Sequence, residues 1–79
     1  MKFVYSFWCK PLYSEYGAMY SVVASSVSEV VELMKANDPY EFESELGYNI
    51  EYLMECITKG AIIRCHDEED PRIAEYFMT

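Results

Sequence analysis

Apolar and polar residues alternate over residues 2–9, and the apolar ones are mostly aromatic or β-branched. This pattern is typical of a strand, because successive side chains of a strand point to opposite faces. One face of it would carry Phe3, Tyr5 and Phe7, and the other would carry Trp8. Residues 10–17 contain both proline and glycine and predict a loop. A second strand is expected over residues 18–24, so the two form an antiparallel hairpin.

The pattern then changes to a helical period. Ser26 is placed to cap a helix, and Glu29 follows at the spacing of a capping box. The apolar residues recur at i, i+3, i+4 and i+7, which predicts one buried stripe: Val27, Val30, Val31 and Met34. Asn37 ends this helix.

A second helical segment is predicted over residues 39–59. Asp38 would cap it, Pro39 would occupy its first position, and Gly60 would close it. Gly47 interrupts the segment, which leaves open whether it is one kinked helix or two short ones. Its expected apolar stripe comprises Ile50, Leu53, Met54 and Ile57.

A third strand is predicted over residues 61–66. Pro71 restarts the chain, and residues 73–78 form a short terminal element that is either a helix or an edge strand. The prediction is a single α+β domain spanning residues 1–79, with an order of β-β-α-α-β. It has two layers: an antiparallel sheet of about three strands, and two to three helices on one face.

The distribution of charge adds a candidate functional surface to this predicted fold. The chain has 79 residues, a formal net charge of −8, and no Lys or Arg between Lys35 and Lys59. A composition of 52% hydrophobic residues indicates a folded domain rather than a disordered tail. The negative charge argues against direct binding to nucleic acid or to an anionic membrane and favours a basic partner. No stretch is apolar enough to span a bilayer, and the amino-terminal residues do not resemble a signal peptide, so we expect a cytoplasmic protein.

Carboxylates recur at helical spacing in the second helical segment. Glu41 and Glu45 would lie one turn apart, as would Glu51 and Glu55, so each pair projects from one side at about 5–6 Å. Such a surface could occupy the Lys and Arg sites of a nucleic-acid-binding channel, because DNA also presents closely spaced negative charges. The alternative is a solvated face that serves only solubility.

Tyrosines interleave with these carboxylates, and tyrosine is enriched at protein interfaces. A second acidic run, the acidic turn of residues 67–70, follows the predicted third strand. It could bind a hard cation, extend the acidic face, or form a solvated turn. The candidate partner-binding residues are Tyr40, Glu41, Glu43, Glu45, Tyr48, Glu51, Tyr52, Glu55, Asp67, Glu68, Glu69 and Asp70.

Catalytic patterns are lacking. The three cysteines have unrelated spacings and are expected to be reduced thiols, and no zinc-type spacing is present. Cys65 and His66 are adjacent, so on a strand they would point to opposite faces and could not act as a thiolate–imidazole pair. We therefore expect no catalytic residues, no cofactor and no metal. A thiol or metal enzyme using Cys56, Cys65 and His66 is the least favoured hypothesis.

In size, charge and aromatic content the whole chain resembles the small acidic inhibitors encoded by phages and mobile elements, of the anti-CRISPR or anti-restriction type. The resemblance implies a non-enzymatic nucleic-acid mimic in a bacterial cytoplasm, with a basic nucleic-acid-binding protein such as a CRISPR effector as partner. The alternative is a small structural or adaptor domain, with homodimerisation possible, that uses an apolar interface and a merely solubilising acidic surface.

Overall fold

The sheet consists of four antiparallel strands in the order β3-β1-β2-β4. The computed structural model describes residues 1–12, 15–43 and 47–78. Its elements are β1 (Phe3–Cys9), β2 (Ala18–Ala24), α1 (Val27–Asn37), α2 (Pro39–Glu43), α3 (Ile50–Lys59), β3 (Ala61–Arg64) and β4 (Arg72–Met78). The predicted α+β class and hairpin are confirmed, with β1 and β2 in register from Phe3 opposite Ala24 to Cys9 opposite Ala18.

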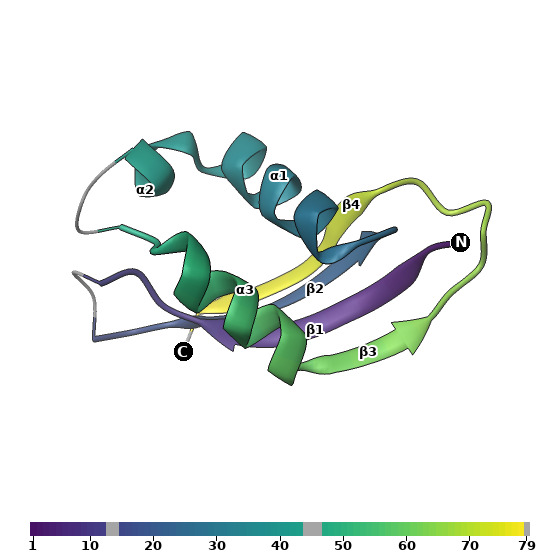
Figure 1. Cartoon of the computed structure of the whole chain (residues 1–79), viewed down its shortest axis with the longest axis horizontal. Helices are drawn as coiled ribbons and strands as arrows, with labels where there is room; N and C mark the ends of the chain where they lie inside the picture. Colours follow the sequence, from purple (N-terminus) through teal and green to yellow (C-terminus); the bar gives the residue numbers. More distant parts are fainter. Residues whose placement is uncertain (13–14, 44–46, 79) are drawn as a thin grey trace.

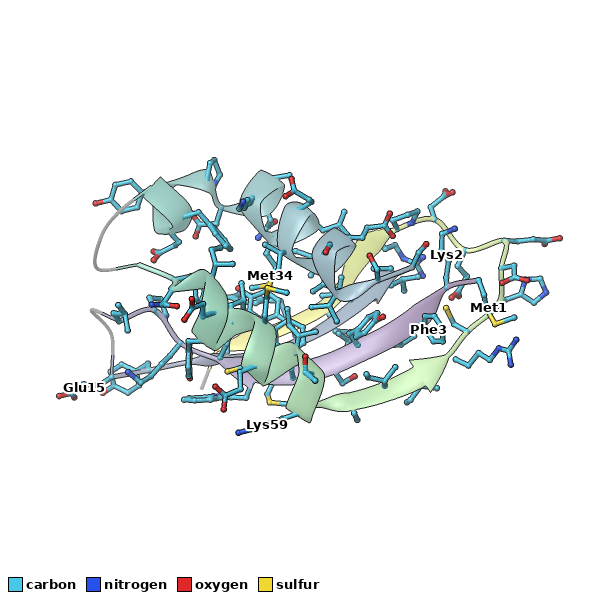
Figure 2. The ribbon with its side chains drawn as sticks, in the orientation of Figure 1. Met1, Lys2, Phe3, Glu15, Met34 and Lys59 are labelled. Carbon is cyan, nitrogen blue, oxygen red and sulfur yellow. The ribbon has the colours of Figure 1, made fainter. Side chains whose placement is uncertain are left out.

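All three helices lie on one side of the sheet (Figure 1). The alternation predicted for β1 holds, since Tyr5 and Phe7 are buried beneath the helices while Trp8 is exposed on the opposite face. Met34 points from α1 into the space between the helices and the sheet (Figure 2) and is buried there. The core is therefore the single apolar layer between the sheet and the helices.

The predicted capping of α1 is present. The Ser26 hydroxyl accepts a hydrogen bond from the Glu29 N–H at 3.2 Å, and the Glu29 carboxylate accepts one from the Ser25 N–H at 2.7 Å. The helix runs to Asn37 as expected, and the Asp38 N–H donates to the Met34 carbonyl at 2.9 Å.

The segment 39–59 forms two helices, which settles the alternative that the sequence left open. α2 ends at Glu43, and α3 begins after Asn49, whose side chain caps it. Gly47 allows the chain to return against α2, because a Cβ at this position would lie 1.8 Å from the Glu41 carbonyl oxygen. Gly60 closes α3 as predicted.

The expectation of about three strands was too low. The terminal element is a strand, β4, that pairs with β2. Its sequence contains no clean alternation, so local pattern could not distinguish strand from helix. The terminal segment is a strand because it pairs with the free edge of β2, whose backbone N–H and C=O groups need hydrogen-bond partners. In this ladder Ser21 lies opposite Glu75 and Val22 opposite Ile73, so Ala74 forms a bulge on the outer strand.

The molecule is elongated, with principal extents of 36 × 20 × 19 Å. β3 runs away from the end of α3, and the connection from β3 to β4 crosses one end of the sheet near the amino terminus (Figure 1). α2 lies at the opposite end. This arrangement decides which acidic residues can act together.

Candidate functional site

The acidic candidate surface is built where α2 meets the start of α3. The Tyr48 N–H donates to the Glu41 carbonyl at 2.9 Å, and the Leu12 N–H donates to the Gly47 carbonyl at 3.0 Å. These bonds place α2, the beginning of α3 and the β1–β2 connection at one end of the molecule. Glu43 is the last residue of α2, and Glu45 lies outside the described residues.

On α3 the carboxylates of Glu51 and Glu55 are exposed, one helical turn apart. Glu55 forms an ion pair with Lys59 at 2.5 Å, and this contact lowers the pKa of Glu55 and raises the pKa of Lys59. The charge of Glu55 is therefore balanced by Lys59, which lies at the end of the segment that lacks Lys and Arg.

The three candidate tyrosines have different surroundings. Tyr40 is 71% exposed on α2. Tyr48 is half-buried, with its ring packed at 5.3 Å from that of Phe42 and its hydroxyl 3.4 Å from the Tyr20 hydroxyl. Tyr52 is half-buried on α3 and hydrogen-bonds the backbone of Lys10. Tyr40 thus offers free contact area, whereas Tyr48 mainly anchors the segment to the core.

The acidic turn lies at the other end of the molecule and so does not extend the surface of α2 and α3 (Figure 1). Cations accompany it: Asp67 lies 3.8 Å from the amino group of Met1, and Glu69 lies 3.8 Å from the Arg72 guanidinium. Glu68 lies 4.0 Å from the His66 ring. Figure 2 shows Met1 at this end, far from Glu15. The candidate residues that the structure describes therefore divide between two ends of the molecule, and Asp70 belongs with the turn.

A cluster of thiols and phenols lies beneath the acidic surface. Burial raises the pKa of the Cys9 thiol, and the hydrogen bond with Tyr48 opposes part of this rise, so that the net pKa is about 12. Burial likewise raises the pKa of Tyr20 to about 12 and raises that of Tyr48. The hydrogen bond with Cys56 raises the pKa of Tyr52 to about 12. These groups are neutral at pH 7, and a protonated thiol is a poor nucleophile.

The Cys65 thiol is also neutral at pH 7, because desolvation and the neighbouring Glu69 raise its pKa. Among the described residues, no group of three or more His, Cys, Asp or Glu side chains is arranged to hold a metal ion. Within that part of the chain, no helix combines the length and apolar character needed to cross a bilayer.

The face of the sheet opposite the helices carries two exposed apolar sites. Trp8 and Met19, at 41% and 39% exposure, lie opposite one another on β1 and β2, and Ile63, at 58% exposure, lies beyond Ser6 and Ser21 on the same face. The Trp8 ring lies so close over Gly17 that a Cβ there would be 2.3 Å from it. The alternation of β1 predicted Trp8 on the face opposite Phe3, Tyr5 and Phe7, but its partner Met19 follows from the register of the hairpin, which the sequence did not give.

Comparison of the chain with protein-family models, with curated proteins and with solved structures found no match.

Proposed function

We propose that this chain is a non-enzymatic binding protein that docks the acidic surface of α2 and α3 onto the basic nucleic-acid-binding surface of a partner. The observation that carries the proposal is the absence of any Lys or Arg between Lys35 and Lys59 in a segment that folds into these two helices. Stability alone favours Lys four residues after Glu, as in the Glu55–Lys59 pair that ends α3, whereas Glu51 has Glu55 at that spacing and like charges there repel.

Exposed groups at this end support the proposal. Glu51 and Glu55 project from α3, and Tyr40 adds a rigid, amphipathic contact on α2. Carboxylates one turn apart approximate the repeated negative charge of a nucleic-acid backbone. Inhibition would follow from occupancy, because a bound mimic excludes the nucleic acid, and a CRISPR effector or restriction enzyme has a channel of the required charge.

The direct test is the charge-neutral variant Glu41→Gln, Glu45→Gln, Glu51→Gln and Glu55→Gln. Its matched control changes the acidic turn instead, with Asp67→Asn, Glu68→Gln, Glu69→Gln and Asp70→Asn, so that the net charge of the chain changes by the same amount. Each protein is used to capture partners from nuclease-treated bacterial lysate, and the retained proteins are identified by mass spectrometry.

The wild type and the turn variant are expected to retain a nucleic-acid-handling protein at about 0.1 M salt and to lose it at about 1 M, where the Debye length is about 3 Å. The helix variant is expected to lose it at both. Equal retention by the helix variant contradicts the proposal, as does equal loss by both variants, since the latter would reflect net charge rather than this surface.

The exposed apolar pair of Trp8 and Met19 favours a second candidate, a small structural or adaptor domain. In that case the partner, which could be a second copy, contacts Trp8 and Met19, and the acidic surface only confers solubility. Retention would then survive 1 M salt and be lost on Trp8→Ala, whereas the mimic predicts the opposite on both counts.

A further inference from the structure

We propose that the outer edge of β3 pairs with the same edge of a second copy, forming a symmetric dimer with one continuous antiparallel sheet. This inference concerns a different surface from the acidic end and does not rest on its function.

β3 is an open edge of the sheet. It pairs with β1 on one side, and no described element lies along the other side (Figure 1). Proteins limit pairing at such edges with proline, bulges, charged side chains or very short strands. The other edge strand, β4, has a bulge at Ala74 and carries Glu75, whereas β3 reads Ala-Ile-Ile-Arg, without proline or bulge, and only its shortness and Arg64 limit its pairing.

The pairing with β1 determines which backbone groups are available. The Cys65 N–H donates to the Lys2 carbonyl at 3.0 Å, continuing the ladder in which Phe3 lies opposite Arg64. Because hydrogen-bonded pairs alternate along an antiparallel ladder, Ile63 also directs its N–H and carbonyl toward β1. The N–H and carbonyl groups of Ile62 and Arg64 therefore point outward from the sheet.

These outward groups select one register. When Ile63 lies opposite Ile63 of the second copy, Ile62 exchanges hydrogen bonds with Arg64 of that copy, and the reverse pair forms by symmetry. Two other symmetric registers exist. One places Arg64 opposite itself, which sets like charges together and requires Ile62 to bond His66, whose carbonyl already accepts from the Glu69 N–H at 3.2 Å. The other places Ile62 opposite itself and requires Gly60 to bond Arg64. The Gly60 N–H is already engaged by the carbonyls of Cys56 and Ile57 at the end of α3.

Charge favours a copy of this chain as the occupant. In the selected register Lys59 is level with Asp67 of the second copy, at both ends of the paired edge. Lys59 protrudes from the end of α3 (Figure 2), and beyond its ion pair with Glu55 its ammonium group has further donors. The exposed side chain of Ile63 meets its equivalent at a non-hydrogen-bonded pair, where side chains are closest.

So short an edge buries little surface, so the dimer is expected to be weak and concentration-dependent. Sedimentation equilibrium from about 10 µM to about 500 µM, in 0.15 M salt to screen the repulsion between two acidic chains, should show the mass rising to twice that of one chain. A mass equal to that of one chain over the whole concentration range overturns the proposal. The same result is expected if this edge binds a strand of another protein instead of a second copy, so that case also counts against the proposal.

Ile63→Lys sets like charges opposite one another at the dimer axis and should raise the dissociation constant at least about tenfold. Met19→Lys makes the same change at a similarly exposed apolar site on β2, away from the edge, and should leave the dimer intact. Circular dichroism checks the fold of both, and equal behaviour of the two variants contradicts the proposal.

The register is tested by cross-linking in a Cys56→Ser, Cys65→Ser background. Ile63→Cys should form a disulfide-linked dimer under mild oxidation, because the facing Cα atoms of a non-hydrogen-bonded pair are about 4.5 Å apart. Ile62→Cys should not. If Ile62→Cys cross-links instead, or neither does, the register is wrong.

A charge exchange gives a second readout: Lys59→Glu should weaken the dimer, and adding Asp67→Lys should restore it.

Discussion

Leu53 and Met54 are neighbours on α3 with opposite surroundings. Leu53 is fully buried against the sheet, whereas Met54 is 40% exposed. Both belong to the apolar stripe expected from the sequence, as do buried Ile57 and exposed Ile50. Periodicity finds the helix and its general orientation, but which two of four apolar positions are covered depends on where the helix rests on the sheet.

Leu53→Ala should therefore destabilise the protein by about 2–5 kcal/mol, because it removes buried methyl groups and leaves a cavity. Met54→Ala should change the free energy of unfolding by no more than about 0.5 kcal/mol, as expected for a surface position. Urea unfolding of both variants checks this, and similar losses in the two would mean that α3 is rotated from the described position.

Gly17 is required by the ring that lies over it. Gly17→Ala should destabilise by about 1–3 kcal/mol, since its Cβ would lie 2.3 Å from the Trp8 ring and 2.7 Å from the Cys9 carbonyl oxygen, so that the ring or strand must move. In a Trp8→Leu background the same substitution should cost less, because only the overlap with the Cys9 carbonyl remains. A double-mutant cycle from urea unfolding measures the difference, and an additive result would refute the contact.

At the scale of elements, local signals predicted best. The Ser26 cap, the end of α1 and the closure of α3 at Gly60 each depend on residues a few positions apart, and the structure has them as predicted. β4 and the position of the acidic turn were not predictable in this way. Both depend on strand order, which is decided by pairing between residues far apart in sequence.

The cluster that joins β1, β2 and Tyr48 should make the protein sensitive to alkali. Cys9 has its pKa raised from 9.0 to about 12, and Tyr20 from 10.0 to about 12. Above these ordinary values the unfolded chain loses protons that the folded chain keeps, so stability falls as pH rises. The contribution is complete below about pH 9 and is lost between about pH 9 and 12.

Urea unfolding at a series of pH values should show this decline, and Cys9→Ala should make it shallower between about pH 9 and 10. The slope between about pH 6.5 and 7.5 serves as the control, because neither group titrates appreciably there. An unchanged alkaline slope in the variant would mean that Cys9 is not desolvated as described.

For the whole molecule, charge is the dominant unfavourable feature. Among the described residues, four exposed ion pairs join groups that are charged at pH 7, and solvent screens each of them, so they add little to stability. They cannot offset the repulsion of a net charge of −8. The net charge follows from the composition alone, whereas the division of the acidic residues between two ends follows only from the fold.

Salt should therefore stabilise the fold. Raising NaCl from about 0.01 M to about 0.5 M should increase stability by up to about 1 kcal/mol, which corresponds to about 4–8 °C for a domain of this size. Differential scanning calorimetry at low protein concentration measures the shift. A decrease in the melting temperature would mean that the local ion pairs outweigh the overall repulsion.

The strand order also makes the fold mechanically unequal. β1 is held by a ladder on each side, whereas β4 is held by one ladder that a bulge interrupts. A pulling force applied through β4 can detach it from β2 and leave the β3-β1-β2 ladders in place. The same force applied through β1 must break two ladders at once and separates the sheet at its centre. An unfolding motor in a cell would therefore meet less resistance from the carboxyl-terminal strand than from the amino-terminal one.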